Sequence, residues 1–188
     1  AINENVDLAG RVDVPMLPWA QAVYEKRKGD ISKDDPEALC LPPGVPRMST
    51  TPYPWTILQT PQFVAFLYEG GAHVWRKVFM GRQVHDPIVE ETWLGDSIGW
   101  WEGDTLVIES TSFNDSTWLG RGGFMHTADM KIVERLTRVG NELRYDMTVE
   151  DPMFVEPWVV PTRILRAGAA NVVPERRDCE VYEEGEFV

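Results

Sequence analysis

From Trp55 onward the sequence is a succession of short apolar runs, each bounded by Gly, Pro, Asn or Asp. Runs of this length, rich in β-branched and aromatic residues and closed by turn-forming residues, are typical of β-strands. We expect strands over residues 55–60, 62–69, 73–80, 96–101, 104–111, 129–138, 141–150 and 157–166, with 178–184 as a weaker candidate. The spacing of these runs predicts an antiparallel meander.

Two of the predicted turns have a clear chemical basis. Gly103 separates one pair of runs and Gly140-Asn141 another, and both are residue types that tight hairpin turns require. A meander of about eight or nine strands can close on itself, which removes its exposed edges. The sequence therefore predicts a mainly β fold, an antiparallel meander that closes into a lipocalin-like (calycin-type) barrel.

The chain has 188 residues, which suits one structural domain with two segments. Residues 55–188 form the predicted barrel, and residues 1–54 an N-terminal arm and Pro-rich strap. Pro18 can occupy the first turn of a short helix that runs to Lys28. The strap, residues 40–54, is so rich in proline that we expect it to run extended over the domain, with neither a helix nor a central strand.

Charge and hydropathy exclude several classes of partner. The net charge of -12 and the lack of a dense basic run argue against nucleic acid and against an anionic membrane surface. No run approaches the roughly 18 apolar residues that span a bilayer, so we expect no membrane insertion. The remaining partner class is a small organic molecule, together with a homo-oligomer as an option.

Two features bear on localisation. The chain opens at Ala1 without an initiator Met, which suits an exported protein, periplasmic or extracellular, that has lost its signal peptide, or a trimmed chain. Cys40 and Cys179 are the only cysteines. They form either a disulfide in an oxidising compartment or two separate buried thiols.

Glu134 is the most informative polar residue. By strict alternation it shares a strand face with Met130, Ile132 and Leu136, and so points inward. An unpaired buried carboxylate has a raised pKa, which suits a general acid or base. The alternatives are a salt bridge to an inward arginine, for which Arg47 is a candidate, or a bulge that turns the side chain outward.

The three histidines show no metal-binding spacing. A metal site would have to combine His73, His85 and His126 from distant segments, so we predict no metal and no cofactor. His126 lies at the end of the long connection 112–128 and could act as a general acid or base oriented by Asp115. The alternatives are an Asx-turn at Asn114 and Asp115 and an exposed loop histidine.

Other side chains complete the candidate site. Arg47 and Tyr53 of the strap could stabilise a developing negative charge, the first with a planar fork and the second with a hydroxyl. The tryptophans are more often core or rim residues, although aromatic walls suit an apolar ligand. Residues expected to line a ligand pocket are Glu69, His85, Trp101, Trp118 and Tyr145. For Glu69, the alternative is a solvated strand end.

Several common signatures are missing. The sequence has no Gly-x-Ser-x-Gly elbow, no phosphate-binding glycine loop and no dinucleotide fingerprint. These absences argue against serine hydrolases, kinases and classical dehydrogenases.

In combination, a set of motifs over residues 40 to about 165 resembles a poorly characterised family of exported bacterial proteins. The motifs are Cys40-Leu-Pro-Pro-Gly-Val-Pro-Arg47, Thr51-Pro-Tyr-Pro54, Leu67-Tyr-Glu69, Gly81-Arg82 with His85, Trp101-Glu-Gly-Asp-Thr-Leu-Val107, Phe113-Asn-Asp-Ser-Thr-Trp-Leu119, His126 and Glu134-Arg135. The chain departs from the family pattern at Met125 and Thr127 beside His126, and at Val133 before Glu134. The resemblance implies export and a compact β fold, and no particular reaction.

The leading hypothesis is a small-molecule enzyme that works by general acid–base proton transfer, as a lyase, hydratase or isomerase, in a barrel pocket. His126, oriented by Asp115, would be the base or acid, with Glu134 as a second titrating group, and Arg47 or Tyr53 would stabilise developing negative charge. The alternative is a non-catalytic, lipocalin-like binder of an apolar or aromatic ligand. A third reading is an envelope protein whose acidic surface serves an assembly partner.

Overall fold

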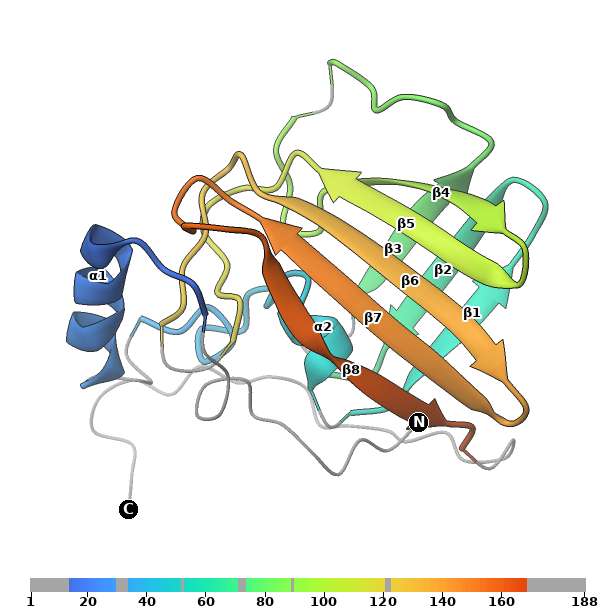
Figure 1. Cartoon of the computed structure of the whole chain (residues 1–188), viewed down its shortest axis with the longest axis horizontal. Helices are drawn as coiled ribbons and strands as arrows, with labels where there is room; N and C mark the ends of the chain where they lie inside the picture. The colour runs from blue at the N-terminus through green and yellow to red at the C-terminus, as the bar shows by residue number, and fades with distance from the viewer. Residues whose placement is uncertain are drawn as a thin grey trace.

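The computed structural model describes residues 14–29, 34–51, 53–70, 74–88, 90–120 and 123–168. Its centre is a single sheet of eight strands that curls into a half-barrel (Figure 1). The strands are β1 (Trp55–Gln59), β2 (Phe63–Tyr68), β3 (Trp75–Met80), β4 (Asp96–Glu102), β5 (Thr105–Thr111), β6 (Lys131–Val139), β7 (Glu142–Glu150) and β8 (Trp158–Arg166). The helices in the described part are α1 (Pro18–Lys28) and α2 (Arg47–Thr50).

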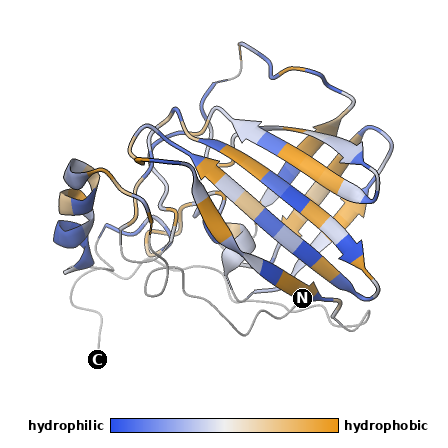
Figure 2. Ribbon diagram, viewed as in Figure 1, coloured by the Kyte–Doolittle hydropathy of each residue, from blue (hydrophilic) through white to orange (hydrophobic). Residues whose placement is uncertain are grey.

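The strands and turns expected from the pattern are confirmed. Each of the eight predicted runs is a strand, α1 occupies the predicted helix, and the candidate strand 178–184 lies outside the described residues. Gly103 and Gly140 have φ values of 59° and 61°, in the region that glycine adopts without strain, and each turns the chain between paired strands. Figure 2 shows the alternation of apolar and polar residues along β6 and β7 that underlies these assignments.

The strand order follows the sequence, from β1 at one edge to β8 at the other, but the sheet is not wholly antiparallel. β3 and β4 are parallel, with Val78 beside Ser97. A parallel pair requires the chain to return to the end from which it started, and residues 81–95 make that return. The sheet is therefore mixed, and the prediction of a pure meander is corrected at this one connection.

Closure of the barrel is the second correction. Within the described residues, the edge strands β1 and β8 do not pair with each other, so the sheet stays a half-barrel. Its concave side is covered by the strap, because Val45 and Met48 are buried in the main core. Figure 1 shows α2 between the part of the sheet formed by β6–β8 and the part formed by β1–β3. The strap takes the place that further strands would occupy in a closed barrel.

The strap also differs from its predicted conformation. We expected no helix there, yet Arg47–Thr50 forms one helical turn, and these residues are buried instead of lying over the surface. The turn is possible because the four residues after Pro46 contain no proline, and a proline ahead of a helix removes no helical hydrogen bond. Burial follows from the apolar face that the concave sheet offers.

Neither described helix is long and apolar enough to cross a membrane. The main hydrophobic core lies between the strap and the concave face of the sheet. Its sheet residues include Val64, Phe66, Val78, Ile108, Ile132, Leu136, Met147, Val149, Val160 and Leu165. Polar side chains interrupt this apolar surface at its centre, and they form the candidate site.

Candidate functional site

Glu134 points inward, as alternation predicted, and is 1% exposed. One carboxylate oxygen, Oε2, accepts a hydrogen bond from Nη2 of Arg76 at 2.5 Å. The other, Oε1, accepts a short hydrogen bond from the hydroxyl of Tyr145. The salt-bridge alternative is therefore correct for Glu134, but its partner is Arg76 of β3 and not Arg47.

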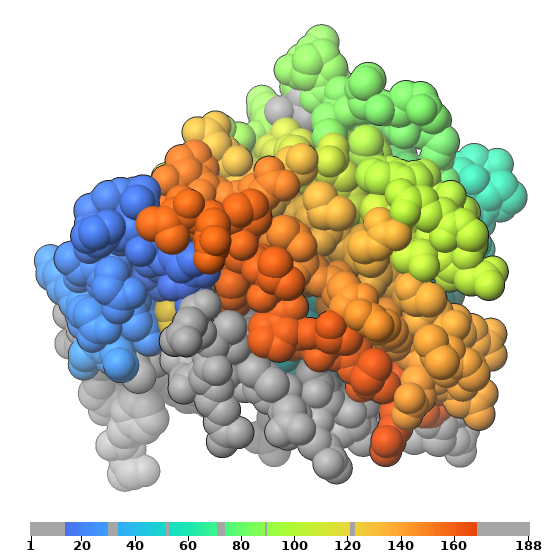
Figure 3. All heavy atoms as spheres, in the orientation of Figure 1, coloured from blue at the N-terminus to red at the C-terminus, as the bar shows by residue number. Residues whose placement is uncertain are grey.

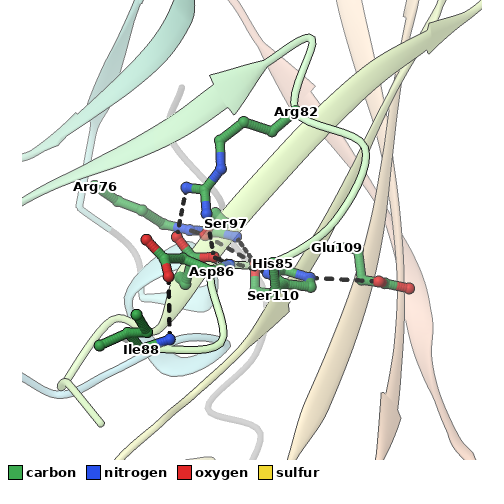
Figure 4. A network of polar contacts seen from close by, with 9 residues as sticks. Arg76, Arg82, His85, Asp86, Ile88, Ser97, Glu109 and Ser110 are labelled. Atoms are coloured by element: carbon green, nitrogen blue, oxygen red, sulfur yellow. Dashed lines mark hydrogen bonds and ion pairs between the residues drawn. The ribbon is translucent and has the colours of Figure 1, made fainter. Parts of the chain in front are cut away.

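The guanidinium of Arg76, on β3, also forms hydrogen bonds with side chains of β4 and β5. Its Nε donates to the hydroxyl of Ser97 on β4 at 3.0 Å, and its Nη2 also donates to Ser110 on β5 at 2.6 Å. The two serine hydroxyls are themselves 2.9 Å apart. Figure 4 shows Arg76 reaching toward these serines from its own strand. Since Arg76 is 2% exposed, this network lies wholly inside the protein.

The strap closes the cluster from the open side of the half-barrel. The hydroxyl of Ser49, on α2, lies 3.2 Å from that of Tyr68 on β2. The carbonyl oxygen of Ser49 accepts a hydrogen bond of 3.4 Å from Nη1 of Arg163 on β8. Tyr145 is paired with Arg163 in the sheet register, so both ends of the sheet and the strap meet here. We call the set Ser49, Tyr68, Arg76, Ser97, Ser110, Glu134, Tyr145 and Arg163 the polar cluster.

Burial sets the protonation of this cluster. It raises the pKa of Tyr145 well above the usual value for tyrosine, and the charge of Glu134 adds to that rise. Burial also raises the pKa of Tyr68, against a smaller opposing effect of Arg76. Although burial opposes it, the contact with Glu134 raises the pKa of Arg76. Both tyrosines therefore stay neutral hydrogen-bond donors near neutral pH, beside a charged pair.

A cavity of about 340 Å³ lies at the end of the half-barrel, between β1 and the end of β8. We call it the seam pocket. It is lined by Trp55, Ile57, Arg138, Asn141, Glu142, Leu143, Leu165, Arg166, Ala167 and Gly168. Its volume and its mixture of apolar walls with a few polar groups are typical of small-molecule sites.

The seam pocket adjoins the polar cluster. Trp55 pairs with Tyr68 in the register of β1 and β2, and their ring centroids are 6.1 Å apart. Leu143 and Leu165 pair with each other one same-face step from the pair of Tyr145 and Arg163. The apolar walls of the pocket therefore continue into the residues that carry the hydroxyl and guanidinium groups.

His126 is buried away from these groups. Its Nδ1 donates to the carbonyl oxygen of Thr127 at 2.9 Å, so that the neutral ring accepts a hydrogen bond at Nε2 from the hydroxyl of Thr117, at 2.5 Å. Burial lowers its pKa. The histidine is thus 1% exposed and neutral, and the alternative of an exposed loop histidine is wrong.

Asp115 does not orient His126 through a hydrogen bond, since both ring nitrogens already have other partners. It is exposed, and the Asx-turn reading holds at its neighbour, where the side chain of Asn114 accepts a hydrogen bond from the backbone of Ser116 at 3.2 Å. Within the described residues, the partners of His126 and those of Glu134 have no member in common. The structure does not join the two predicted titrating groups in one site.

Arg47 also has partners outside the polar cluster. It forms a two-point contact with Asp35, at 2.6 and 2.9 Å, and a third with Glu37 at 2.6 Å. This trio fixes α2 to the preceding part of the strap. The ring of Tyr53 lies so close to Gly70 that a Cβ there would come within 2.5 Å of a ring carbon. Glu69 is half-buried at the end of β2.

The remaining predicted ligand-binding residues lie in different places. Trp101 is 49% exposed, whereas Trp118 is buried under the guanidinium of Arg27, 5.7 Å from the ring centroid. Neither belongs to the seam pocket. Of the five residues expected to line a ligand pocket, Tyr145 is the one that the structure places in the polar cluster.

His85 belongs to a second polar group, on the opposite face of β4 and β5. Its Nδ1 lies 2.9 Å from Asp96, which also accepts two hydrogen bonds from Arg82 at 3.0 and 3.3 Å. Its Nε2 faces Glu109 at 3.3 Å. Figure 4 shows Arg82, His85 and Glu109 around this point, and Figure 3 shows the connection between β3 and β4 projecting from the surface. These contacts fasten the returning connection to the sheet.

No metal centre is present in the part of the chain that the structure describes, where no three His, Cys, Asp or Glu residues gather closely enough to hold an ion. His73, one of the three histidines considered for such a site, lies outside the described residues. Cys179 does too, so its pairing with Cys40 stays a prediction.

Six residues of the cluster were not among the predicted site residues: Ser49, Tyr68, Arg76, Ser97, Ser110 and Arg163. Arg76 alternates with Val78 and Met80, which indicated that it could face inward with them. The opposite face of the strand carries Trp75 and Phe79 and is equally apolar, so the inward face could not be chosen from the sequence. Arg163 had no usable signal. A register shift on β8 opposite Tyr145 and Met147 changes which residues face inward, and strict alternation cannot locate it.

No protein-family model, no curated protein and no solved structure matches this chain. Membership of the exported bacterial family, and export itself, therefore stay proposals that rest on the sequence motifs. The assignment of a function rests on the polar cluster and the seam pocket.

Proposed function

We propose that the protein is a small-molecule enzyme that works by general acid–base proton transfer, as a lyase, hydratase or isomerase, in the seam pocket. The observation that supports this most is the contact between the Tyr145 hydroxyl and the Glu134 carboxylate beside an apolar cavity. A hydroxyl bonded to a carboxylate can pass a proton in either direction, which is the minimum that such chemistry needs. The ligand would lie on the concave face, as in a lipocalin-like fold.

The proposed step moves one proton along a short path. A proton leaves a substrate carbon for the hydroxyl oxygen of Tyr145, while the hydroxyl's own proton passes to Glu134. The return of the proton to a different substrate atom completes an isomerisation, and the departure of a leaving group, which takes the bonding electrons, completes a lyase reaction. Hydration is that elimination in reverse.

The neighbours of Glu134 have supporting roles in this proposal. Arg76 holds the carboxylate in place and balances its charge. Tyr68, kept neutral by burial, is a donor for a substrate oxygen that becomes negative during the reaction. The proposal assigns the proton to Glu134 and Tyr145 and not to His126, because His126 is bonded to Thr117 and Thr127.

The test is turnover on a panel of cyclic and phenolic substrates. Tyr145→Phe removes one hydroxyl and keeps the ring, and we expect it to lower turnover by about 10²–10⁴-fold, the usual contribution of an acid–base group. Tyr24→Phe is the matched control. Tyr24 is also buried, but it belongs to α1, outside the polar cluster, and its ring stacks on Phe124. Circular dichroism verifies that both variants fold. Equal turnover in wild type and Tyr145→Phe would eliminate the proposed mechanism.

A second candidate is a non-catalytic binder of an apolar or aromatic ligand. It is favoured by the fact that both oxygens of Glu134 already have partners, as they would in a purely structural cluster. This reading predicts that Trp55→Ala lowers ligand affinity strongly while Tyr145→Phe changes it little. The turnover measurement above distinguishes the two, since a binder converts none of the substrates.

A further inference from the structure

Arg163 carries the least compensated charge of the polar cluster. It is 7% exposed. Its Nη1 makes one long hydrogen bond, 3.4 Å, to the carbonyl oxygen of Ser49. Its Nη2 is buried without a hydrogen-bond partner. Within the described residues, its guanidinium has no ion pair with a carboxylate, so a full positive charge is held in the interior by a single backbone carbonyl.

The other charges near Arg163 are paired off. Arg76 and Glu134 neutralise each other. The carboxylates of Asp35 and Glu37 contact Arg47. The polar cluster therefore contains two guanidinium groups, those of Arg76 and Arg163, and one carboxylate, that of Glu134. Its charges sum to an excess of one positive charge. Burial of an unpaired ion is costly, and this cost disappears when a counter-ion binds.

The position of this charge points to where a counter-ion would lie. On the inward face of β8, Arg163 is followed by Leu165, a wall residue of the seam pocket. Across the strand pair it faces Tyr145, whose hydroxyl is a hydrogen-bond donor. Arg76 contributes a second buried nitrogen without a partner, its Nη1. Two buried guanidinium nitrogens without a partner thus belong to the polar cluster, in which Arg163 lies one same-face step along β8 from the cavity wall at Leu165.

We propose that the seam pocket takes a small organic anion with a single negative charge, a carboxylate or an enolate, on an apolar or aromatic body. The charged group binds Arg163, whose planar fork matches two oxygens. The body lies between Trp55, Leu143 and Leu165. This inference rests on the function proposed for the same pocket and names the class of its substrate or ligand.

Two probes of equal shape test the charge. 2-Naphthoate carries the carboxylate, and 2-naphthamide replaces it with a neutral amide. We expect wild-type protein to bind 2-naphthoate at least roughly tenfold more tightly than 2-naphthamide, as a hydrogen bond to a buried charge contributes. Titration calorimetry measures both affinities, and Trp55→Ala, which removes a wall of the pocket, should weaken the binding of both probes.

Arg163→Gln removes the charge, and Arg144→Gln is the matched control on the outer face of β7. We expect Arg163→Gln to lose the preference for 2-naphthoate and to bind the amide as wild type does. Arg144→Gln keeps the preference. The melting temperature of Arg163→Gln without ligand should equal or exceed that of wild type, because the variant no longer buries an unpaired ion. A merely structural Arg163 would instead lower the melting temperature and leave the affinities unchanged.

Three results overturn the inference: equal binding of the two probes by wild type, no binding of 2-naphthoate, or unchanged 2-naphthoate affinity in Arg163→Gln. Its failure is distinguishable from that of the proposed reaction. Arg163-dependent binding of 2-naphthoate with normal turnover in Tyr145→Phe keeps the anion site and removes the acid–base mechanism. If Tyr145→Phe loses turnover but wild type shows no preference for 2-naphthoate over 2-naphthamide, the acid–base mechanism stands and the anion site is removed.

Discussion

The hydroxyl of Tyr145 and the carboxylate of Glu134 meet diagonally across the β6–β7 pair on the concave face of the sheet. In the register, Tyr145 pairs with Leu136, the next residue on the same face of β6 after Glu134. Long side chains at such diagonal positions can reach each other. Together with Arg76, this contact satisfies both oxygens of a fully buried carboxylate, and the stability of the fold depends on that balance.

Glu134→Gln should lower the free energy of unfolding by about 3–5 kcal/mol. The substitution removes one charge of a buried pair and leaves the guanidinium of Arg76 without compensation. Urea denaturation measures the effect. Glu150→Gln, the same change at the exposed end of β7, serves as the control and should cost less than about 1 kcal/mol.

The double variant Arg76→Met/Glu134→Leu should recover most of that loss, because replacing a buried ion pair by apolar residues of similar volume is often close to neutral. Urea denaturation of Arg76→Met, Glu134→Leu and the double variant completes this double-mutant cycle. A double variant as unstable as the sum of its single changes would contradict this account of the pair.

Alkaline pH should destabilise the protein through Tyr68 and Tyr145. Burial raises both pKa values, so the folded state keeps these protons above pH 10, where tyrosine in the unfolded chain loses them. The contribution of the two groups is therefore complete below about pH 10 and decreases as the pH rises further. We expect a steep fall of the free energy of unfolding above pH 10, weaker in Tyr145→Phe. An ultraviolet phenolate signal from every tyrosine of the folded protein near pH 10 would refute this.

Acid pH should destabilise the protein through His126. Burial lowers its pKa, so below about pH 6.5 the unfolded chain takes up a proton that the folded protein does not. The free energy of unfolding should then decrease as the pH falls from about 6.5 toward the lowered pKa of the folded state. Denaturation curves at a series of pH values measure this slope, which should flatten in His126→Gln. A slope that persists unchanged in the variant assigns it to other groups.

Arg47→Gln should cost far more stability than Arg144→Gln, although both arginines make two-point contacts with an aspartate. Arg47 and Asp35 are buried, and the variant would remove the guanidinium that pairs with the Asp35 carboxylate, at about 3–5 kcal/mol. Arg144 is exposed, and solvent screens its pair with Asp146, so its loss should have only a small effect. Denaturation of both variants tests this, and equal losses would show that burial is not the deciding factor.

The strands and the inward direction of Glu134 could be predicted because both depend on local patterns. Residues of β6 and β7 alternate strictly, and Gly103 and Gly140 mark the turns, so a strand's faces can be read from its own residues. The helix from Pro18 to Lys28 follows from local rules as well. None of these features needs knowledge of a distant segment.

The partners in the site could not be predicted in the same way. Glu134 lies 58 positions from Arg76 in the chain, and Ser49 lies 114 positions from Arg163. Arg47 was the arginine expected to pair with Glu134, but in the structure it bonds to Asp35. Which arginine reaches which carboxylate depends on how the half-barrel curls and where the strap enters it.

By itself, the sequence determined the strands, their turns and the burial of one carboxylate, since hydrophobic alternation and turn chemistry act over a few residues. Only the tertiary structure decided that β3 and β4 run parallel, that the barrel stays open beside Trp55, and that Arg163 faces inward. Those outcomes arise from pairing between distant segments, a register shift on β8 and the filling of the concave face by α2.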